Sequence, residues 1–131
     1  MIIDANIFLE VILDQEKSER CKIFLRDILN GDKQAAMLSV SIDSIVIVML
    51  RNALESAKIK VFLESLIRYK GLKFYQPKIK DRINALHYMD IYRLDYEDAL
   101  VLQSAISTKS EEIVSFDKHF DKVKEIKRIE P

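Results

Sequence analysis

Four aspartates lie beside short apolar runs of the chain, and their carboxylates are the side chains with the clearest chemical use. Asp4 directly follows the first three residues, and Asp117 directly follows the run 112–116. Asp43 and Asp98 each fall in the first turn of an expected helix. Carboxylates held close together raise each other's pKa. A hard divalent cation such as Mg²⁺ or Mn²⁺ would neutralise them, and such an ion can activate water and offset charge on a phosphate.

Each acid also has an ordinary structural interpretation. Asp98 and Asp95 could form a helix-capping pair, and Asp43 could simply favour the helix dipole. Asp117 could serve a turn. Asp4 is the exception, because an acid that directly follows three apolar residues is costly to bury unless something binds it. A shared site therefore depends on whether the fold brings the acids to one edge.

Apolar runs alternate with amphipathic segments along the chain, which is typical of an α/β protein. The expected strands cover residues 1–3, 35–39, 72–75 and 112–116, with a weaker fifth strand near 126–129. The expected helices cover residues 7–12, 21–28, 42–50, 59–67 and 79–92, followed by one that Asp95 caps. This alternation predicts a mostly parallel sheet of four or five strands, covered on both faces. Right-handed crossovers would place the carboxyl ends of the strands at one edge, where open α/β sheets bind ligands.

A few residues indicate how these helices begin, end and pack. Gly31 and Gly71 are typical of helix stops, and Ser41 is a plausible N-cap. The helix after Ser41 is apolar nearly all round, which predicts either deep burial or a surface for a partner. The next helix should turn one apolar stripe toward the core, formed by Ile59, Phe62, Leu63, Leu66 and Ile67.

Composition favours one domain that spans residues 1–131, since 131 residues with 49% hydrophobic content can form a single core. The 21 basic and 21 acidic residues cancel, which argues against attachment to nucleic acid by bulk charge alone. Cys21 is the single cysteine, so no internal disulfide forms and a reducing compartment is expected. The longest uncharged apolar run, 44–50, is far shorter than the roughly 20 residues of a membrane span. We therefore expect a soluble, cytoplasmic protein with no membrane partner.

Three motifs follow one another along the chain: Asp4-Ala5-Asn6, Asp98-Ala99-Leu100 and the segment from Ser115 to Phe120. In order and separation they resemble the PIN-domain nucleases, and chain length matches the small VapC-type toxins of that family. The resemblance spans nearly the whole chain. It implies a three-layer α/β/α sandwich and a ribonuclease that depends on Mg²⁺ or Mn²⁺.

The resemblance also implies roles for individual residues. Asp4, Asp98 and Asp117 match the first, third and fourth acids of the family, and would hold the metal. Asn6 matches the small polar residue after the first acid. Ser115 matches the hydroxyl residue that precedes the last acid by two positions and helps to hold the site.

The second acid departs from the family pattern. The family usually has Glu shortly before the apolar run of this helix, where Ser44 and Ile45 stand here. Asp43 is the nearest carboxylate, and one position in a helix is about 100° of rotation. Asp43 could therefore reach a metal directly, through water, or not at all. Its participation is favoured because no other carboxylate lies between Asp32 and Glu55.

Two functions remain open from the sequence. The first is a metal-dependent endoribonuclease, the toxin of a type II toxin–antitoxin pair, with RNA as substrate and an antitoxin protein as partner. The family also implies a homodimer, for which the apolar run from Ile45 to Leu50 could serve. The second is a catalytically weakened PIN-like module that binds RNA or protein, which the missing Glu favours. A haloacid-dehalogenase-like phosphatase fits less well, because that chemistry needs a second Asp where Asn6 stands.

Overall fold

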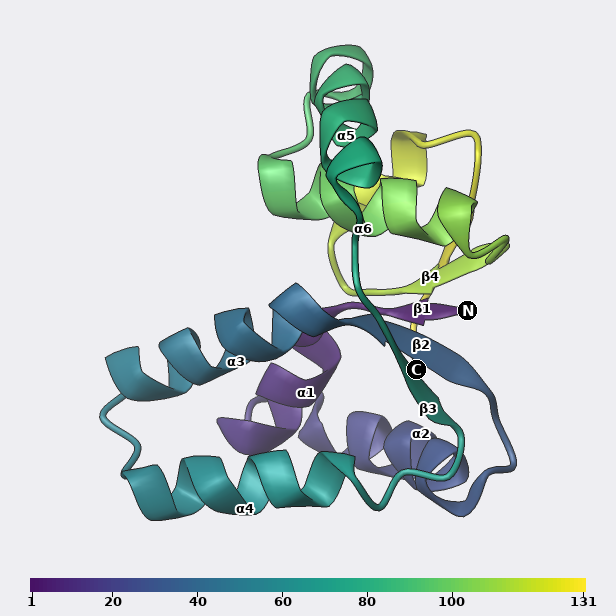
Figure 1. Cartoon of the computed structure of the whole chain (residues 1–131). Coiled ribbons are helices and arrows are strands. Elements are labelled where there is room, and N and C mark those ends of the chain that lie inside the picture. The colour runs from purple at the N-terminus through teal and green to yellow at the C-terminus, as the bar shows by residue number, and fades with distance from the viewer.

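A parallel five-stranded sheet runs through the middle of the molecule, with helices on both of its faces (Figure 1). The computed structural model describes residues 1–131. The strands are β1 (Ile2–Ile3), β2 (Ala35–Leu38), β3 (Leu72–Tyr75), β4 (Glu112–Val114) and β5 (Lys127–Ile129). They pair in the order β3-β2-β1-β4-β5, every pair parallel. The α/β class and the parallel sheet predicted from the sequence are confirmed.

The helices form two outer layers, which completes a three-layer α/β/α sandwich. They are α1 (Ala5–Ile12), α2 (Ser18–Asn30), α3 (Ser39–Arg51), α4 (Ser56–Leu66), α5 (Ile79–Tyr92) and α6 (Tyr96–Ser107), with a 3₁₀ helix η1 (Lys118–Lys122). Helices α1 to α4 lie on one side of the sheet, and α5 and α6 lie on the other (Figure 1). No helix has both the length and the apolar character needed to cross a membrane.

Each face of the sheet has its own apolar core. The first core contains 17 buried residues and joins the sheet to α1–α4, and the second contains 13 and joins it to α5, α6 and η1. Neighbouring residues of a strand divide between the cores: Ile3 and Met37 belong to the first, Ile2 and Leu38 to the second. Because successive side chains of a strand point to opposite faces, a strand covered on both faces must be apolar throughout. That is why apolar runs located these strands in the sequence.

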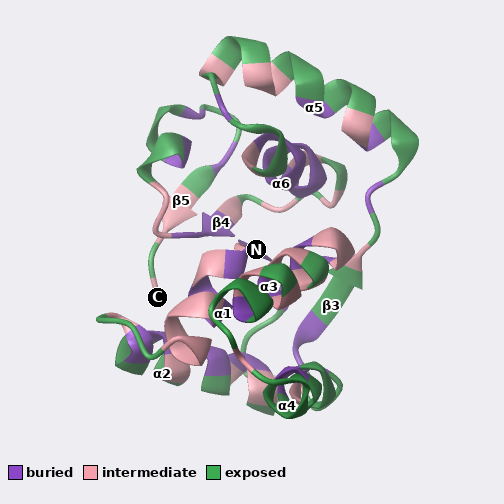
Figure 2. Ribbon diagram, turned by 90° about the vertical axis from the view of Figure 1, so that its left-hand side faces the viewer, coloured by how far each residue is buried: buried purple, intermediate pink, exposed green.

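Helix α6 is the buried helix of the second layer, and α5 covers it from outside (Figure 2). An unbroken run from Ala99 to Ala105 is buried, which fixes the helix against the sheet. The helix begins after Asp95, whose carboxylate accepts a hydrogen bond of 2.8 Å from the backbone N–H of Asp98. This is the cap predicted from the sequence. Asp98 is therefore carried at the start of a rigid, buried helix.

The two glycines have different roles. Gly31 ends α2 in the left-handed conformation, with φ of 91°, as predicted. The prediction that Gly71 ends a helix is wrong, because α4 ends at Leu66. A Cβ atom at Gly71 would lie 2.0 Å from the carbonyl oxygen of Lys33. Glycine is required there because two backbone segments approach each other closely before β3.

Two of the predicted boundaries that shift in the structure affect the segments around the site. Helix α3 begins at Ser39 with Leu38 in the cap position, so the predicted cap at Ser41 is wrong, and Ser41 is buried inside the helix. Strand β4 ends at Val114, two residues before the expected end at Phe116. The segment that follows β4 therefore carries Asp117 in a loop rather than at the strand end.

The apolar residues of α3 and α4 are only partly buried. In α3, Ile47 and Leu50 keep 49% and 57% of their surface exposed, so the helix is not buried all round. Leu63 of α4 and Ile67, which directly follows the helix, are 39% and 85% exposed, so the predicted stripe is narrower than expected. Both helices thus leave apolar side chains in solvent on the same layer of the molecule.

Candidate active site

Asp4 lies at the junction of β1 and α1, in a closed group of side-chain hydrogen bonds. Its Oδ2 accepts one bond from Nδ2 of Asn6 (2.7 Å) and one from the hydroxyl of Ser115 (2.5 Å). Nδ2 of Asn6 also donates to Oγ of Ser115 (3.0 Å). The backbone N–H of Asp4 donates to the carbonyl of Val114 (3.0 Å), so the β1–β4 contact holds the three side chains together. The supporting role predicted for Asn6 and Ser115 would depend on these hydrogen bonds.

The surroundings of Asp4 disfavour its charged form. Burial raises the pKa of Asp4 from 3.8 to about 6, and the negative charge of Glu97 adds to the effect. The hydrogen bonds from Ser115 and from the backbone act in the opposite direction, because they stabilise the carboxylate. Asp4 thus lacks a positive charge to balance it.

Asp98 lies in the first turn of α6, and its carboxylate has no hydrogen bond or ion pair with the rest of the chain. Burial raises its pKa from 3.8 to about 7. Negative charges raise it further, first that of Asp95, then those of Asp117, Asp4 and Glu97. The effects of Asp4 and Asp117 show that the three predicted acids share one electrostatic environment.

Asp117 lies between β4 and η1, where two hydrogen bonds and one ion-pair contact with His119 hold it. Its backbone N–H donates to Oγ of Ser115 (2.9 Å). Its Oδ1 accepts from the backbone N–H of His119 (2.8 Å) and lies 2.9 Å from Nδ1 of the same residue. Ser115 therefore contacts both Asp4 and the backbone of Asp117, and couples the first acid to the last.

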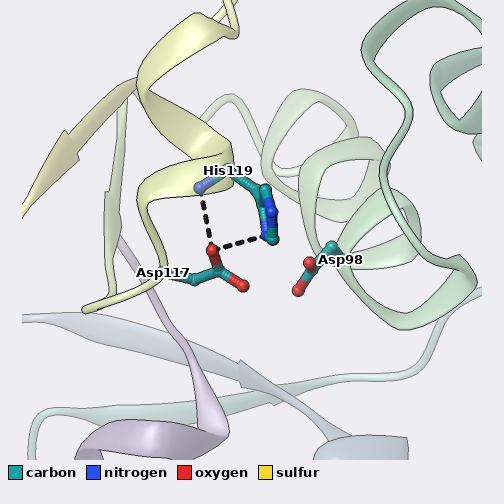
Figure 3. A group of neighbouring side chains, drawn as sticks. All are labelled: Asp98, Asp117 and His119. Atoms are coloured by element: carbon teal, nitrogen blue, oxygen red, sulfur yellow. Dashed lines mark hydrogen bonds and ion pairs between the residues drawn. The ribbon is translucent and has the colours of Figure 1, made fainter.

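Asp98, Asp117 and His119 form a compact group of possible metal ligands (Figure 3). One ligand atom from each lies within 4.8 Å of the others. No lysine or arginine forms an ion pair with Asp4, Asp98 or Asp117, and His119 is the only basic partner of the group. In addition, the amide oxygen Oδ1 of Asn6 is buried without a hydrogen-bond partner. Clustered carboxylates with no lysine or arginine to balance them are the donor set that a hard divalent ion prefers.

Asp43 lies apart from this group. It is exposed on α3 and forms no ion pair or side-chain hydrogen bond. The prediction that Asp43 lies in the first turn is wrong, because α3 begins at Ser39 and its first turn contains no acid. It is also absent from the charges with the largest effect on the pKa of Asp4 or Asp98. The structure brings Asp4, Asp98 and Asp117 together, while a role for Asp43 stays a prediction.

Two neighbours of the site, His119 and Glu97, are not among the predicted site residues. His119 belongs to the third motif, but its spacing alone does not indicate that its ring lies beside Asp98. Glu97 acts on the pKa of both Asp4 and Asp98, and its only sequence signal is its place in the acidic first turn of α6.

The family model of the PIN domain matches residues 1–126 of this chain. Three solved structures have a similar fold. The first is a toxin–antitoxin complex from Klebsiella pneumoniae, with 12% identity, TM-score 0.70 and coverage of 95% of this chain and 93% of that chain. The second is VapC20 of Mycobacterium tuberculosis, described as a sarcin–ricin-loop-cleaving toxin, with 10% identity, TM-score 0.73 and coverage of 92% of both chains. The third is VapBC2 of Rickettsia felis bound to a promoter DNA fragment, with 14% identity, TM-score 0.67 and coverage of 98% and 96%. No curated protein matches the sequence.

Proposed function

Because this chain belongs to the PIN-domain family, we propose that it is a metal-dependent endoribonuclease and the toxin of a type II toxin–antitoxin pair. The observation that carries the proposal is the meeting of Asp4, Asp98 and Asp117 in one electrostatic environment without a lysine or arginine to balance them. The acids repel one another when no cation is present, and a bound divalent ion would remove that repulsion.

Asp4, Asp98 and Asp117 would hold Mg²⁺ or Mn²⁺. When bound, such an ion activates water and neutralises charge that develops on a phosphodiester. The chain contributes the geometry: Ser115 and Asn6 orient the Asp4 carboxylate, and the backbone of His119 orients that of Asp117. Asp43 is proposed as a fourth acid that acts from the solvent side of α3, and the products would carry 5′-phosphate and 3′-hydroxyl ends.

RNA is the proposed substrate and a cognate antitoxin the proposed protein partner, both in the cytoplasm. VapC20, which shares the fold, is described as cleaving the sarcin–ricin loop, and two of the similar structures are toxin–antitoxin assemblies. A homodimer is proposed as well, and the exposed Ile47 and Leu50 of α3 offer apolar surface for an interface.

A second function is favoured by one observation: Asp43 is exposed and does not belong to the group of possible metal ligands. If α3 supplies no working carboxylate, the protein would bind RNA or a protein partner without cutting.

Cleavage of a labelled structured RNA in Mg²⁺, in Mn²⁺ and in EDTA tests the proposal. Metal-dependent cleavage that Asp98→Asn abolishes would support the enzyme. RNA binding by the native protein with no cleavage in either metal would support the binding module instead.

A further inference from the structure

His119 is held against the carboxylate group by both its backbone and its ring. Its backbone N–H and its Nδ1 both contact Oδ1 of Asp117, at 2.8 and 2.9 Å. The next residue, Phe120, is buried in the second core and anchors this turn of η1. The side chain of His119 is 68% exposed, and the one polar contact of its ring is the ion-pair contact with Asp117. Figure 3 shows the ring between Asp117 and Asp98.

Resting on the proposed function, we infer that His119 supplies a nitrogen ligand to the ion held by Asp98 and Asp117, and that this ligand favours Mn²⁺ over Mg²⁺. A ring nitrogen and one oxygen from each acid already lie within 4.8 Å of one another. Adjacent ligands of a six-coordinate ion with bonds of about 2.1 Å are separated by about 3 Å. The 2.9 Å between Nδ1 of His119 and Oδ1 of Asp117 is compatible with that separation and is also an ordinary ion-pair contact, so metal binding itself must be measured.

The chemistry of the ligand decides which ion benefits. Mg²⁺ binds oxygen ligands almost alone, whereas imidazole suits transition-metal ions, whose affinity for nitrogen-containing sites rises from Mn²⁺ toward Cu²⁺. Neutral imidazole also adds a ligand without adding a charge to a site that already holds three carboxylates. A site built from Asp98, Asp117 and His119 should therefore discriminate between two ions that an all-carboxylate site would accept similarly.

A positioning role is the alternative that must be separated from ligation. In that case His119 would only donate a hydrogen bond that orients Asp117. The variant His119→Asn distinguishes the two, because its amide nitrogen can donate to Asp117 from the place of Nδ1 but supplies no imidazole nitrogen. His87 provides a matched control, since it is an exposed histidine on α5, outside the carboxylate group.

The test measures metal binding, without RNA, on the untagged full chain. Calorimetric titrations with Mn²⁺ and with Mg²⁺ would compare the native protein with His119→Ala, His119→Asn and His87→Ala. Pulsed electron paramagnetic resonance of the Mn²⁺-loaded forms would detect a directly coordinated nitrogen. We expect both His119 variants to lose the nitrogen signal and to bind Mn²⁺ at least about tenfold more weakly, a loss that even an outer partner of a metal can cause. Mg²⁺ affinity should change much less, and His87→Ala should match the native protein.

The outcomes separate this inference from the function on which it rests. If the native protein binds both ions without a nitrogen signal, and the His119 variants keep the same ratio of affinities, the inference is overturned while a metal-dependent nuclease stands. If His119→Asn retains the preference for Mn²⁺, the residue only positions Asp117, and the inference fails. If the native protein binds neither ion, the proposed function and the inference both fail.

Discussion

Ser115 is the single residue that makes two distant acids into one unit. Its hydroxyl donates to Asp4 at 2.5 Å, and its oxygen accepts the backbone N–H of Asp117 at 2.9 Å. The residue is completely buried, so no water can take its place without rearrangement. A small hydroxyl two positions before the last acid therefore has two roles: it positions both acids, and it stabilises the charged form of Asp4.

Replacing Ser115 should lower both the stability of the protein and its RNA cleavage. Ser115→Ala removes the donor to Asp4 and leaves the N–H of Asp117 without a partner, which should cost about 1–3 kcal/mol of unfolding free energy. Cleavage should fall as well, because both carboxylates lose their orientation. Ser115→Thr keeps the hydroxyl and serves as the control. Chemical denaturation and RNA cleavage measure the two effects, and an alanine variant as stable and active as the native protein would contradict this role.

The raised pKa values of Asp4 and Asp98 predict how stability depends on pH when no metal is present. Both groups have pKa 3.8 when unfolded, and about 6 and about 7 when folded. The folded protein thus binds more protons than the unfolded chain between about pH 4 and pH 7. These two groups should therefore lower the free energy of unfolding as the pH rises through this interval in EDTA.

Denaturation in EDTA at about pH 5 and about pH 8 measures this slope, and the double variant Asp4→Asn/Asp98→Asn isolates the contribution of the two acids. The native protein should lose more stability than the double variant between the two conditions. Equal losses would show that neither acid has a raised pKa in the folded state.

At the scale of elements, the sequence predicted most of what positions the site, and its failures have physical causes. The central strands β1 and β2 are predicted correctly because residues of both contribute to both cores and must be apolar, and α5 is predicted over the residues that it occupies, Ile79–Tyr92. Asp95 was recognised as a cap because its side chain stands three residues before an N–H that it can reach.

The wrong predictions concern features that depend on neighbouring segments. Gly71 was read as a helix stop, but its reason lies in the carbonyl of Lys33, far away in the sequence. The place of His119 beside Asp98 likewise depends on how η1 meets α6, which no local spacing reveals. Local sequence patterns describe the element that contains them, and contacts between elements remain to be found in the structure.

Helix α3 gives the weakest support to the enzyme proposal, because Asp43 is its only acid. An exposed acid near the carboxyl edge can act on water or on the substrate without joining the metal ligands. We therefore expect Asp43→Asn to lower cleavage at least tenfold while leaving the metal affinity nearly unchanged. If Asp43 has no role in the reaction, the change should leave cleavage intact and alter stability little, because Asp43 lies beyond the first turn of α3, where the helix dipole acts.

The variant Ser44→Glu completes this test, since it restores a carboxylate at a place where the family usually has one. If Ser44→Glu raises cleavage and Asp43→Asn does not change it, α3 lacks the second acid of the family pattern. If Asp43→Asn lowers cleavage and Ser44→Glu does not raise it, the shorter side chain of Asp43 already acts as the second acid. RNA cleavage at a fixed metal concentration, with calorimetry of metal binding, measures both variants.

Over the whole molecule the positive and negative charges cancel, but around the three acids of the site they do not. The chain carries 21 basic and 21 acidic residues, yet no lysine or arginine pairs with Asp4, Asp98 or Asp117. The three acids come from β1, α6 and the loop after β4, so they meet only when the sheet and the second helical layer are assembled. The folded protein thus stores repulsion at one edge, and a cation that binds only there should stabilise the fold as a whole.

Millimolar Mg²⁺ or Mn²⁺ should therefore raise the melting temperature of the native protein, because the ion binds the folded cluster and not the unfolded chain. At a metal concentration about 100 times the dissociation constant, the expected gain is about 2.7 kcal/mol. The strands that hold the acids contribute to both cores, so we expect one cooperative transition that moves as a unit. Asp4→Asn/Asp117→Asn should melt at the same temperature with and without metal.

In EDTA, Asp4→Asn should be at least as stable as the native protein near neutral pH, since its amide oxygen can still accept from Asn6 and Ser115 while one repelling charge is gone. Scanning calorimetry measures all of these forms. An unchanged native melt at millimolar metal would remove the cation from the proposal and leave the binding module as the better account of this site.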